Sequence, residues 1–232
     1  MSTAVSSNAE ISQQNPCLPP ESPGTAFAWG TPFALCLLGT LCLRLDMPLA
    51  EFVRSGGIPK AIHQALEQAE VFGHGVGVAF IVLTIYVLDA RRRNWTPTLL
   101  LGALGGGLAA NTLKLAVSRI RPRNVVSLQA SVWETFGPLW HGELQVAGDS
   151  HSFPSAHTGM ATGFAVVLSA MYPQGRWLFF SFAALVGMQR IVSSSHFPSD
   201  VCFGAAVGWV IGHAALRLRH WWRGTEPAVA NQ

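Results

Sequence analysis

Charged side chains are scarce in this chain. Asp, Glu, Lys and Arg make up 12% of its 232 residues, whereas apolar residues make up 50%. About a quarter of the residues in a typical soluble domain are charged, so this balance favours a membrane protein. The net charge is only +3, and the basic residues form short clusters between apolar runs. Because no continuous basic stripe is present, the sequence argues against nucleic acid as a partner.

The chain also lacks paired cysteines and a basic N-terminal segment. Its four cysteines do not have the spacing of a disulfide framework or a zinc site, so they indicate no redox compartment. The first 25 or so residues contain no Lys or Arg, unlike the n-region of a signal peptide. We expect residues 1–25 to form a disordered tail, residues 26–220 a membrane domain and residues 221–232 a cytoplasmic C-terminal tail.

Long apolar runs predict six membrane-spanning helices, since one span needs about 17 to 25 mostly apolar residues. The last three runs are short and partly polar, which makes them weaker candidates than the first three. The six cover residues 26–43, 71–90, 97–117, 157–173, 177–194 and 200–216.

A helix of a different kind is predicted between the first two spans. Apolar residues recur every three or four positions from Ile58 to Ala69, with polar residues opposite and Pro59 at the start. This pattern indicates an amphipathic helix lying in the membrane interface. The predicted fold is therefore all-α: a six-helix transmembrane bundle with an interfacial amphipathic helix between spans 1 and 2.

Basic clusters outside the suspected site predict the orientation in the membrane. With six spans they all fall on one side, which the positive-inside rule makes cytoplasmic. They are Arg91, Arg92, Arg93, Arg176, Arg217, Arg219 and Arg223. Both termini would then be cytoplasmic, and the site would open to the other side of a plasma or inner membrane. That side also receives the connection at residues 122–153, where Trp133, Phe136 and Trp140 are expected to be interfacial anchors or to line a lipid entrance.

Two basic residues near the end of span three are candidates for function. Arg121 follows Lys114 by about two helical turns, so both could point the same way if the helix continues. Either residue alone could simply extend its charge to the membrane surface. Lys114, however, shares a face with Ala110, Gly107 and Ala103, small residues of the kind that mark helix contacts in lipid. This position favours a functional Lys114 that points into the bundle.

The tripeptide Phe-Pro-Ser occurs twice, each time beside a histidine. In the first copy Pro154 is expected to start span four, because proline suits the first turn of a helix. The next N–H groups, those of Ser155, Ala156 and His157, would then be unpaired at the positive end of the helix, which is suited to phosphate. His157 would lie one turn inside, with its side chain near that anion.

In the second copy Pro198 is expected to start span six, with His196 in the preceding turn and Asp200 in the first turn. Asp200 shares a stripe with three glycines at four-residue spacing, so its carboxylate should face other helices and needs a partner there. If Asp200 accepts from one imidazole nitrogen of His196, the other nitrogen is free to attack. Arg190 adds a fixed charge near the same end, although an ordinary membrane-edge role is the simpler one. The two helix starts would face a common anion.

Three segments together resemble the signature motifs of the type 2 phosphatidic acid phosphatase superfamily, which includes membrane lipid phosphatases and soluble vanadium haloperoxidases. The segments are Lys114-x6-Arg121-Pro122, Pro154-Ser155-Ala156-His157 and Arg190-x5-His196-x3-Asp200. The resemblance implies that His196 is the nucleophile that forms a phosphohistidine and that Asp200 orients it. It implies that His157 protonates the leaving oxygen and later activates water.

The same resemblance assigns the phosphate-binding groups and implies neither a metal nor a cofactor. The groups that would hold the phosphoryl oxygens belong to Lys114, Arg121, Ser155, Arg190 and the N–H of Ala156. Two positions depart from the family pattern. Ala156 stands where glycine is usual, and Gln189 stands where a small residue, often serine, precedes the arginine.

The expected function is therefore that of an integral membrane phosphatase acting on a lipid phosphomonoester or diphosphate, with the bilayer and a phosphorylated lipid as its partners. A phosphotransferase that passes the phosphoryl group to a lipid or sugar hydroxyl remains the main alternative. A non-catalytic lipid-binding or transport protein is disfavoured because His196, His157 and Asp200 are all present, and the spans disfavour a haloperoxidase. Phosphatidate, phosphatidylglycerophosphate, a polyprenyl diphosphate and a lipid A phosphate share one headgroup chemistry, so the sequence names none of them.

Overall fold

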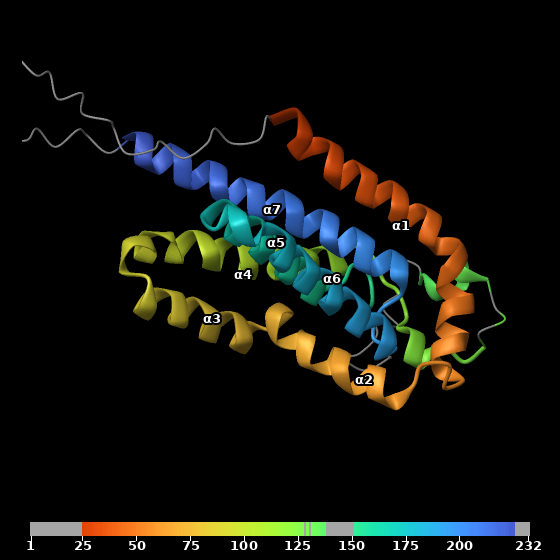
Figure 1. Ribbon diagram of the computed structural model, residues 1–232. Coiled ribbons are helices and arrows are strands. Elements are labelled where there is room, and N and C mark those ends of the chain that lie inside the picture. Colours follow the sequence, from red (N-terminus) through yellow and green to blue (C-terminus); the bar gives the residue numbers. More distant parts are fainter. Residues whose placement is uncertain (1–24, 128, 130, 138–150, 226–232) are drawn as a thin grey trace, which may run out of the picture.

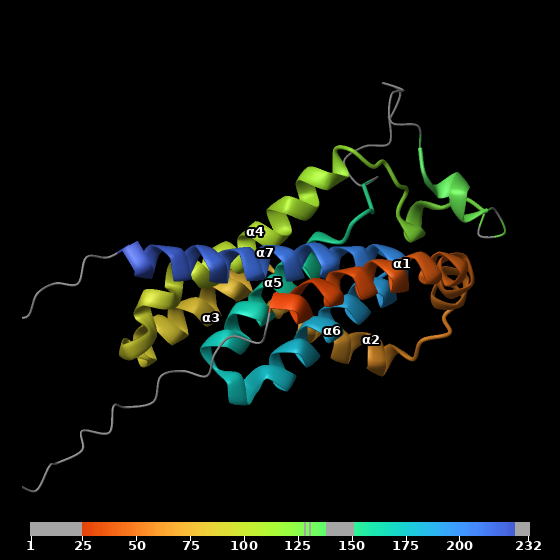
Figure 2. The same cartoon turned by 90° about the horizontal axis from the view of Figure 1, so that it is seen from above.

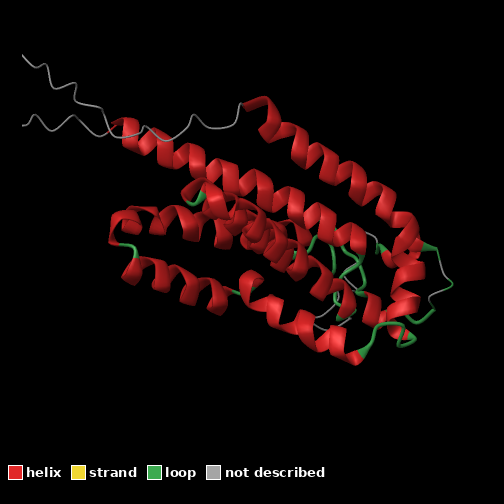
Figure 3. Ribbon diagram, viewed as in Figure 1, coloured by secondary structure: helices red, strands yellow, loops and turns green. Residues whose placement is uncertain are grey.

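The computed structural model describes residues 25–127, 129, 131–137 and 151–225. Within these residues the chain forms helices and connecting segments and no strand (Figure 3). The predicted all-α class is therefore confirmed. Most of the two predicted tails and Trp140 lie outside the described residues, as does the side chain of Arg223.

Seven α-helices in the described part of the chain are linked in part by short 3₁₀ segments. The α-helices are α1 Thr25–Arg54, α2 Lys60–Glu67, α3 Gly75–Leu88, α4 Thr96–Lys114, α5 Ala156–Met171, α6 Arg176–Val192 and α7 Pro198–Thr225. The 3₁₀ segments are η1 Gln68–Gly73, η2 Ala90–Trp95, η3 Pro122–Asn124, η4 Val132–Thr135 and η5 Pro173–Gly175. Each predicted span corresponds to one of the longer helices, and α2 occupies the place of the predicted amphipathic helix.

Two helices are long and apolar enough to cross a membrane. They are α1 from Trp29 to Arg54 and α7 from Pro198 to Trp222. A third candidate combines residues 60–73 with α3, two pieces bent by 63° as in a broken span or a re-entrant loop. Length and composition thus support two or three crossings among the described residues, and the six-span bundle and the interfacial position of α2 stay predictions.

Helix α1 extends well beyond the predicted end of the first span at residue 43. Arg44 and Asp46 interrupt the apolar run, and Pro48 lies inside the helix. The helix nevertheless continues to Arg54 because the Asp46 carboxylate is completely buried against an arginine from another part of the chain. A span predicted from hydropathy alone ends at such a charge, because hydropathy takes no account of a partner elsewhere in the chain.

Helix α5 is the central helix, and it packs against α4, α6 and α7. Its contacts are close because glycines face one another. A Cβ added at Gly106 of α4 would lie 2.4 Å from the carbonyl oxygen of Gly159 in α5, and one added at Gly208 of α7 would lie 2.2 Å from it. Gly204 approaches the Ser155 carbonyl oxygen in the same way, at 2.4 Å. These approaches confirm that the glycine stripe of α7 faces other helices, and they bring the starts of α5 and α7 together.

The six longer helices alternate in direction, so the molecule has two distinct ends (Figure 1). The ends of α4 and α6 and the starts of α5 and α7 lie at one end. In Figure 2 the green segment that follows α4 lies at the same end, close to the end of α1. At the opposite end an Arg219 side-chain nitrogen donates to the Asn94 carbonyl oxygen at 2.5 Å, and the Tyr172 hydroxyl donates to Asp89 at 2.9 Å. The arginines of η2 and the end of α7 are thus far from the two Phe-Pro-Ser segments.

Candidate active site

A buried histidine and carboxylate lie at the start of α7. The distance from His196 Nδ1 to Asp200 Oδ2 is 3.7 Å, and both side chains are almost inaccessible to solvent. The same Asp200 oxygen accepts from the Ser152 hydroxyl at 2.5 Å and from the Phe197 N–H at 2.9 Å. Burial lowers the pKa of the His196 imidazole from its ordinary value, which keeps the ring neutral at pH 7. With Nδ1 directed at the carboxylate, Nε2 is the nitrogen with a free lone pair.

The turn between α6 and α7 holds His196 in place. Ser194 has a φ of 52°, in the left-handed region that commonly ends a helix. The N–H groups of Ser195 and His196 then both donate to the Arg190 carbonyl oxygen, each at 3.1 Å. This backbone arrangement fixes the distance between the histidine and Arg190, a residue that the sequence analysis also placed in the site.

The start of α5 differs from the prediction. Helix α5 begins at Ala156, two residues later than expected, because Ser155 is its N-cap and Pro154 precedes the cap. The Ser155 N–H, expected to be unpaired, donates to the Asp200 carbonyl oxygen at 3.0 Å. Among the described residues the N–H groups of Ala156 and His157, in the first turn of α5, make no backbone hydrogen bond outside the helix. The possible anion cradle therefore contains two N–H groups rather than three, and the two Phe-Pro-Ser segments meet at Asp200.

His157 and Arg190 converge on a residue that the sequence analysis missed. Glu70, in η1, places its Oε1 atom 2.8 Å from Arg190 Nη2 and 3.5 Å from His157 Nε2. Gln189 completes the group: its Oε1 accepts from Arg190 Nε at 2.5 Å, and its Nε2 donates to Glu70 at 3.4 Å. Glu70 lies between the predicted interfacial helix, which ends at Ala69, and the predicted second span, and no sequence signal distinguished it. The unusual Gln189 thus holds Arg190 directly.

Lys114 and Arg121 lie close together for a reason other than the predicted one. Helix α4 ends at Lys114, and Arg121 has an extended backbone with φ −73° and ψ 150°. The condition for that alignment, a helix that continues from Lys114 to Arg121, is therefore not met. Even so, Lys114 lies within electrostatic range of Arg121 and Asp200. His157 also lies within electrostatic range of Lys114.

A second missed residue, Arg119, connects this region to α1. Its guanidinium is completely buried and bonds to Asp200 Oδ1 at 2.5 Å and to Asp46 Oδ2 at 2.6 Å. The carbon of the guanidinium lies 4.5 Å from the Phe136 ring centre and 4.2 Å from that of Phe197. One signal could have identified Asp46: a carboxylate inside an apolar run needs a buried partner. No comparable signal distinguished Arg119 from the other arginines near it.

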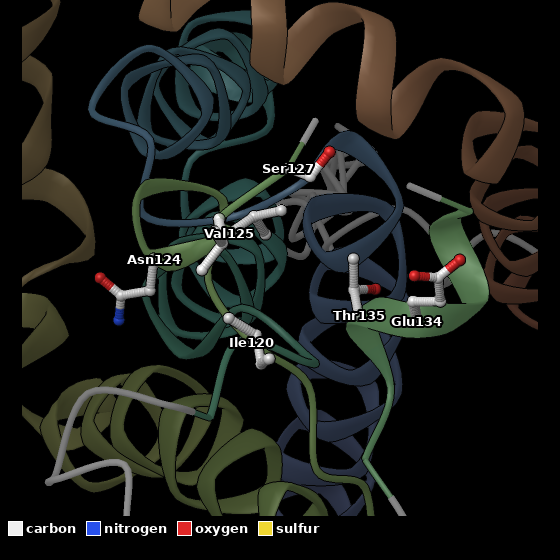
Figure 4. Close-up of a pocket in the computed structure, with 7 residues that line it drawn as sticks. Ile120, Asn124, Val125, Ser127, Glu134 and Thr135 are labelled. Carbon is white, nitrogen blue, oxygen red and sulfur yellow. The ribbon is translucent and has the colours of Figure 1, made fainter. Parts of the chain in front are cut away.

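A cavity lies beside this region and is formed by other residues (Figure 4). It has a volume of about 250 Å³ and is lined by Ile120, Asn124, Val125, Val126, Ser127, Glu134 and Thr135. Two of its lining residues, Ile120 and Thr135, are joined by a backbone hydrogen bond of 2.8 Å next to Arg119. None of the predicted site residues lines the cavity, so it is separate from the predicted phosphate site.

The cluster as a whole is suited to phosphoryl transfer. A neutral imidazole directed at a carboxylate can act as a nucleophile, and a second imidazole nearby can transfer a proton. Fixed cations can stabilise the charge that develops on phosphoryl oxygens. The chain belongs to the PAP2 superfamily, whose sequence profile matches residues 95–223, more than half of the chain.

Named relatives agree with this class. The lipid A 1-phosphatase of Rhizobium johnstonii is 31% identical over 102 residues, which cover 44% of this chain and 38% of the relative. The match therefore spans well under half the length of that curated relative. The lipid A 1-phosphatase of Rhizobium etli matches similarly, with 31% identity over 44% of this chain and 40% of its own length.

Two solved structures share the fold. The crystal structure of Aquifex aeolicus LpxE has a TM-score of 0.57 and 22% identity, covering 75% of this chain and 95% of that one. The PAP2 type phosphatidylglycerolphosphate phosphatase of Bacillus subtilis, described as transmembrane, also has a TM-score of 0.57. Its identity is 18%, covering 86% of this chain and 98% of that one. These likenesses show the fold, and α1 and α7 are long and apolar enough to cross a membrane.

Proposed function

We propose that this chain is a membrane lipid phosphatase that hydrolyses a lipid phosphomonoester or diphosphate through a phosphohistidine on His196. The main support is the direction of His196 Nδ1 toward the buried Asp200 carboxylate, 3.7 Å away, next to the start of α5. That direction leaves Nε2 as the attacking atom. Membership of the PAP2 superfamily provides independent support.

In the first half of the proposed reaction, His196 Nε2 attacks phosphorus and the bond from phosphorus to the lipid oxygen breaks. His157 gives its proton to that oxygen as the lipid alcohol leaves. In the second half, His157 takes a proton from water, the resulting hydroxide attacks phosphorus, and the phosphorus–nitrogen bond breaks. Inorganic phosphate leaves and both imidazoles return to their starting states.

The phosphoryl oxygens are proposed to be held by fixed groups of the protein. Preorganised positive charge and N–H donors are worth most where the charge of the transition state develops. The proposed groups are the side chains of Lys114, Arg121, Arg190 and Ser155 and the N–H of Ala156. Because these cations supply the charge, the proposed reaction needs neither a metal ion nor a cofactor.

The relatives suggest which substrate to test first. The curated matches are named lipid A 1-phosphatases, so we propose a lipid A phosphate as the first candidate. Phosphatidylglycerophosphate is the second, because the Bacillus subtilis protein of the same fold is named a phosphatidylglycerolphosphate phosphatase. Both candidates offer a phosphomonoester on a lipid anchored in the bilayer.

We predict that the purified chain releases inorganic phosphate from at least one lipid in a panel of lipid A, phosphatidylglycerophosphate, phosphatidate and a polyprenyl diphosphate. Activity should persist in excess EDTA, and His196→Ala should abolish it because the covalent route is closed.

His213→Ala is the matched control, since His213 lies farther along α7 and contacts the Trp209 carbonyl oxygen. Loss of activity in EDTA that metal restores, or an active His196→Ala variant, would contradict the proposal. Transfer to an added acceptor without phosphate release would favour the phosphotransferase.

The contact between Glu70 and Arg190 leads to a second prediction. A phosphate that binds Arg190 must compete with the Glu70 carboxylate, which lies 2.8 Å away and is about one-third exposed. Glu70→Gln should therefore tighten competitive inhibition by inorganic phosphate by about two- to fivefold, the range expected for a partly exposed ion pair. The measurement is the inhibition constant for phosphate at fixed pH.

Glu67→Gln provides the control for that variant. Glu67 is a neighbouring carboxylate that pairs with His63 at 3.2 Å on the surface, so its removal should leave the inhibition constant unchanged. If Glu70→Gln weakened phosphate inhibition, Glu70 would be supporting the anion site and not competing for it.

We further propose that the six longer helices cross the membrane and that the site opens on its extracytoplasmic side, with both termini in the cytoplasm. The support is that the arginines of η2 meet α7 near Arg219, at the end of the molecule opposite the two Phe-Pro-Ser segments. Such a basic end is typical of the cytoplasmic side.

A cysteine at Ser131 should react with a membrane-impermeant maleimide in intact cells or spheroplasts, in a variant that lacks the four native cysteines. A cysteine at Asn94 should react only after lysis. Each side chain is exposed in the structure, so accessibility would report the side of the membrane. The reverse labelling pattern would move the proposed substrate to the cytoplasmic leaflet.

A further inference from the structure

We infer that Arg119 and Asp46 are positioning residues for the proposed nucleophile: the Arg119 guanidinium bridges Asp46 and Asp200 and so holds the Asp200 carboxylate against His196. The inference rests on the proposed function for the role of His196. It goes beyond that function because it gives α1, which lies outside the matched residues 95–223, a part in the chemistry.

Every nitrogen of the Arg119 guanidinium has a partner. Nη1 donates to Asp200 Oδ1 at 2.5 Å and to the Ser199 hydroxyl at 2.7 Å. Nη2 donates to Asp46 Oδ2 at 2.6 Å, and Nε donates to the Thr135 hydroxyl at 3.1 Å. Because the guanidinium is planar and rigid, these partners leave it one orientation.

Two aromatic rings complete the enclosure of Arg119. Phe136, from the connection after α4, and Phe197, from the turn before α7, lie 4.5 Å and 4.2 Å from the guanidinium carbon. Phe197 is fully buried and adjoins His196 in the chain. A displacement of Arg119 would therefore disturb the turn that carries the histidine as well as the carboxylate beside it.

The two carboxylate oxygens of Asp200 contact different partners. Oδ1 is bound by Arg119, whereas Oδ2 faces Ser152, the Phe197 N–H and His196 Nδ1. With Oδ1 held, the carboxylate cannot rotate its second oxygen away from the imidazole. The Arg119 contact thus selects the rotamer in which Asp200 can orient His196.

Asp46 also affects the electrostatics of Asp200, in addition to fixing the position of Arg119. One guanidinium lies between two buried carboxylates, so its positive charge is shared between them. If Arg119 faced Asp200 alone, its full attraction would weaken the hold of the Asp200 carboxylate on the imidazole proton. Because the Asp46 carboxylate also interacts with the positive charge of Arg119, Asp200 remains an effective hydrogen-bond acceptor for His196.

Asp46 also connects α1 directly to the first turn of α7. Its Oδ1 accepts from the Ser199 N–H at 3.1 Å, and its Oδ2 accepts from the Ser199 hydroxyl at 2.5 Å. Ser199 lies next to Asp200 in the chain. One carboxylate in α1 therefore contacts both the guanidinium that holds Asp200 and the backbone that carries it.

The test separates positioning from plain structural support. Asp46→Asn keeps the shape of the side chain and removes its charge. It should lower kcat on the order of 10- to 100-fold, the usual cost of a slightly misplaced reacting group. The KM for the lipid and the inhibition constant for inorganic phosphate should stay within about twofold, since Asp46 does not contact the predicted phosphate groups. Arg119→Lys should have the same effect, because an ammonium cannot bridge both carboxylates in one rigid plane.

The decisive measurement is a double-mutant cycle with Asp200→Asn, read as kcat from released phosphate at high enzyme concentration. If Asp46 acts through Asp200, adding Asp46→Asn to the Asp200→Asn variant should lower kcat no further. The matched control is Asp89→Asn, which removes a carboxylate paired with Arg92 at 3.2 Å at the opposite end of the molecule. The control should leave kcat unchanged in both backgrounds.

If the decreases in kcat caused by Asp46→Asn and Asp200→Asn multiplied in the double variant, the inference would be overturned. An effect of Asp46→Asn that is confined to KM would also overturn it. If Asp46→Asn does not yield folded protein, Ser199→Ala removes only the hydroxyl between Asp46 and Arg119. It should give a smaller decrease in kcat that is again absent when Asp200 is Asn. An inactive wild-type chain would overturn the proposed function itself. If the wild-type chain is active but the two decreases in kcat multiply, only the positioning role is overturned.

Discussion

The buried guanidinium of Arg119 between two carboxylates is the constraint on which the rest of the site depends. Asp46 and Asp200 are each completely buried, and a buried charge without a partner is strongly destabilising. Removing one member of such a group typically costs about 3–5 kcal/mol. The fold can therefore bury both carboxylates only if α1, the connection after α4 and the start of α7 meet at Arg119.

Close helix packing then determines what lies next to that point. The glycine contacts of α5 with α4 and α7 leave no room for side chains between the backbones. The start of α5 is consequently held against the start of α7, where the Ser155 N–H meets the Asp200 carbonyl oxygen. Packing along the helices and the ion group at their ends together place His157 and His196 in one region.

Much of this arrangement could be predicted from local patterns in the sequence. The all-α class, the order of the longer helices and the start of α7 at Pro198 follow from apolar runs and from the position of proline. The glycine stripe on α7 correctly indicated a face in contact with other helices. These features depend on residues a few positions apart, which a single sequence displays directly.

The remaining features depend on partners that are distant in the sequence. The Asp46 to Arg119 contact joins residues 73 positions apart, and Glu70 meets Arg190 across a still longer separation. A helix that could have aligned Lys114 with Arg121 does not continue that far, because α4 ends at Lys114. The predicted free N–H of Ser155 was wrong because Asp200 supplies its acceptor. The contacts of Asp46, Glu70 and Ser155 are tertiary, and a single sequence does not display such partners.

The central claim is that the chemistry passes through His196, and trapping the covalent intermediate tests it most directly. Wild-type protein is mixed with a substrate lipid that carries radioactive phosphate and is quenched in alkali within one turnover, because phosphohistidine survives base. Peptide mapping should then place an acid-labile label on His196, and His196→Ala protein should carry none. A label on His157, or rapid turnover with no labelled protein at any time, would contradict the account.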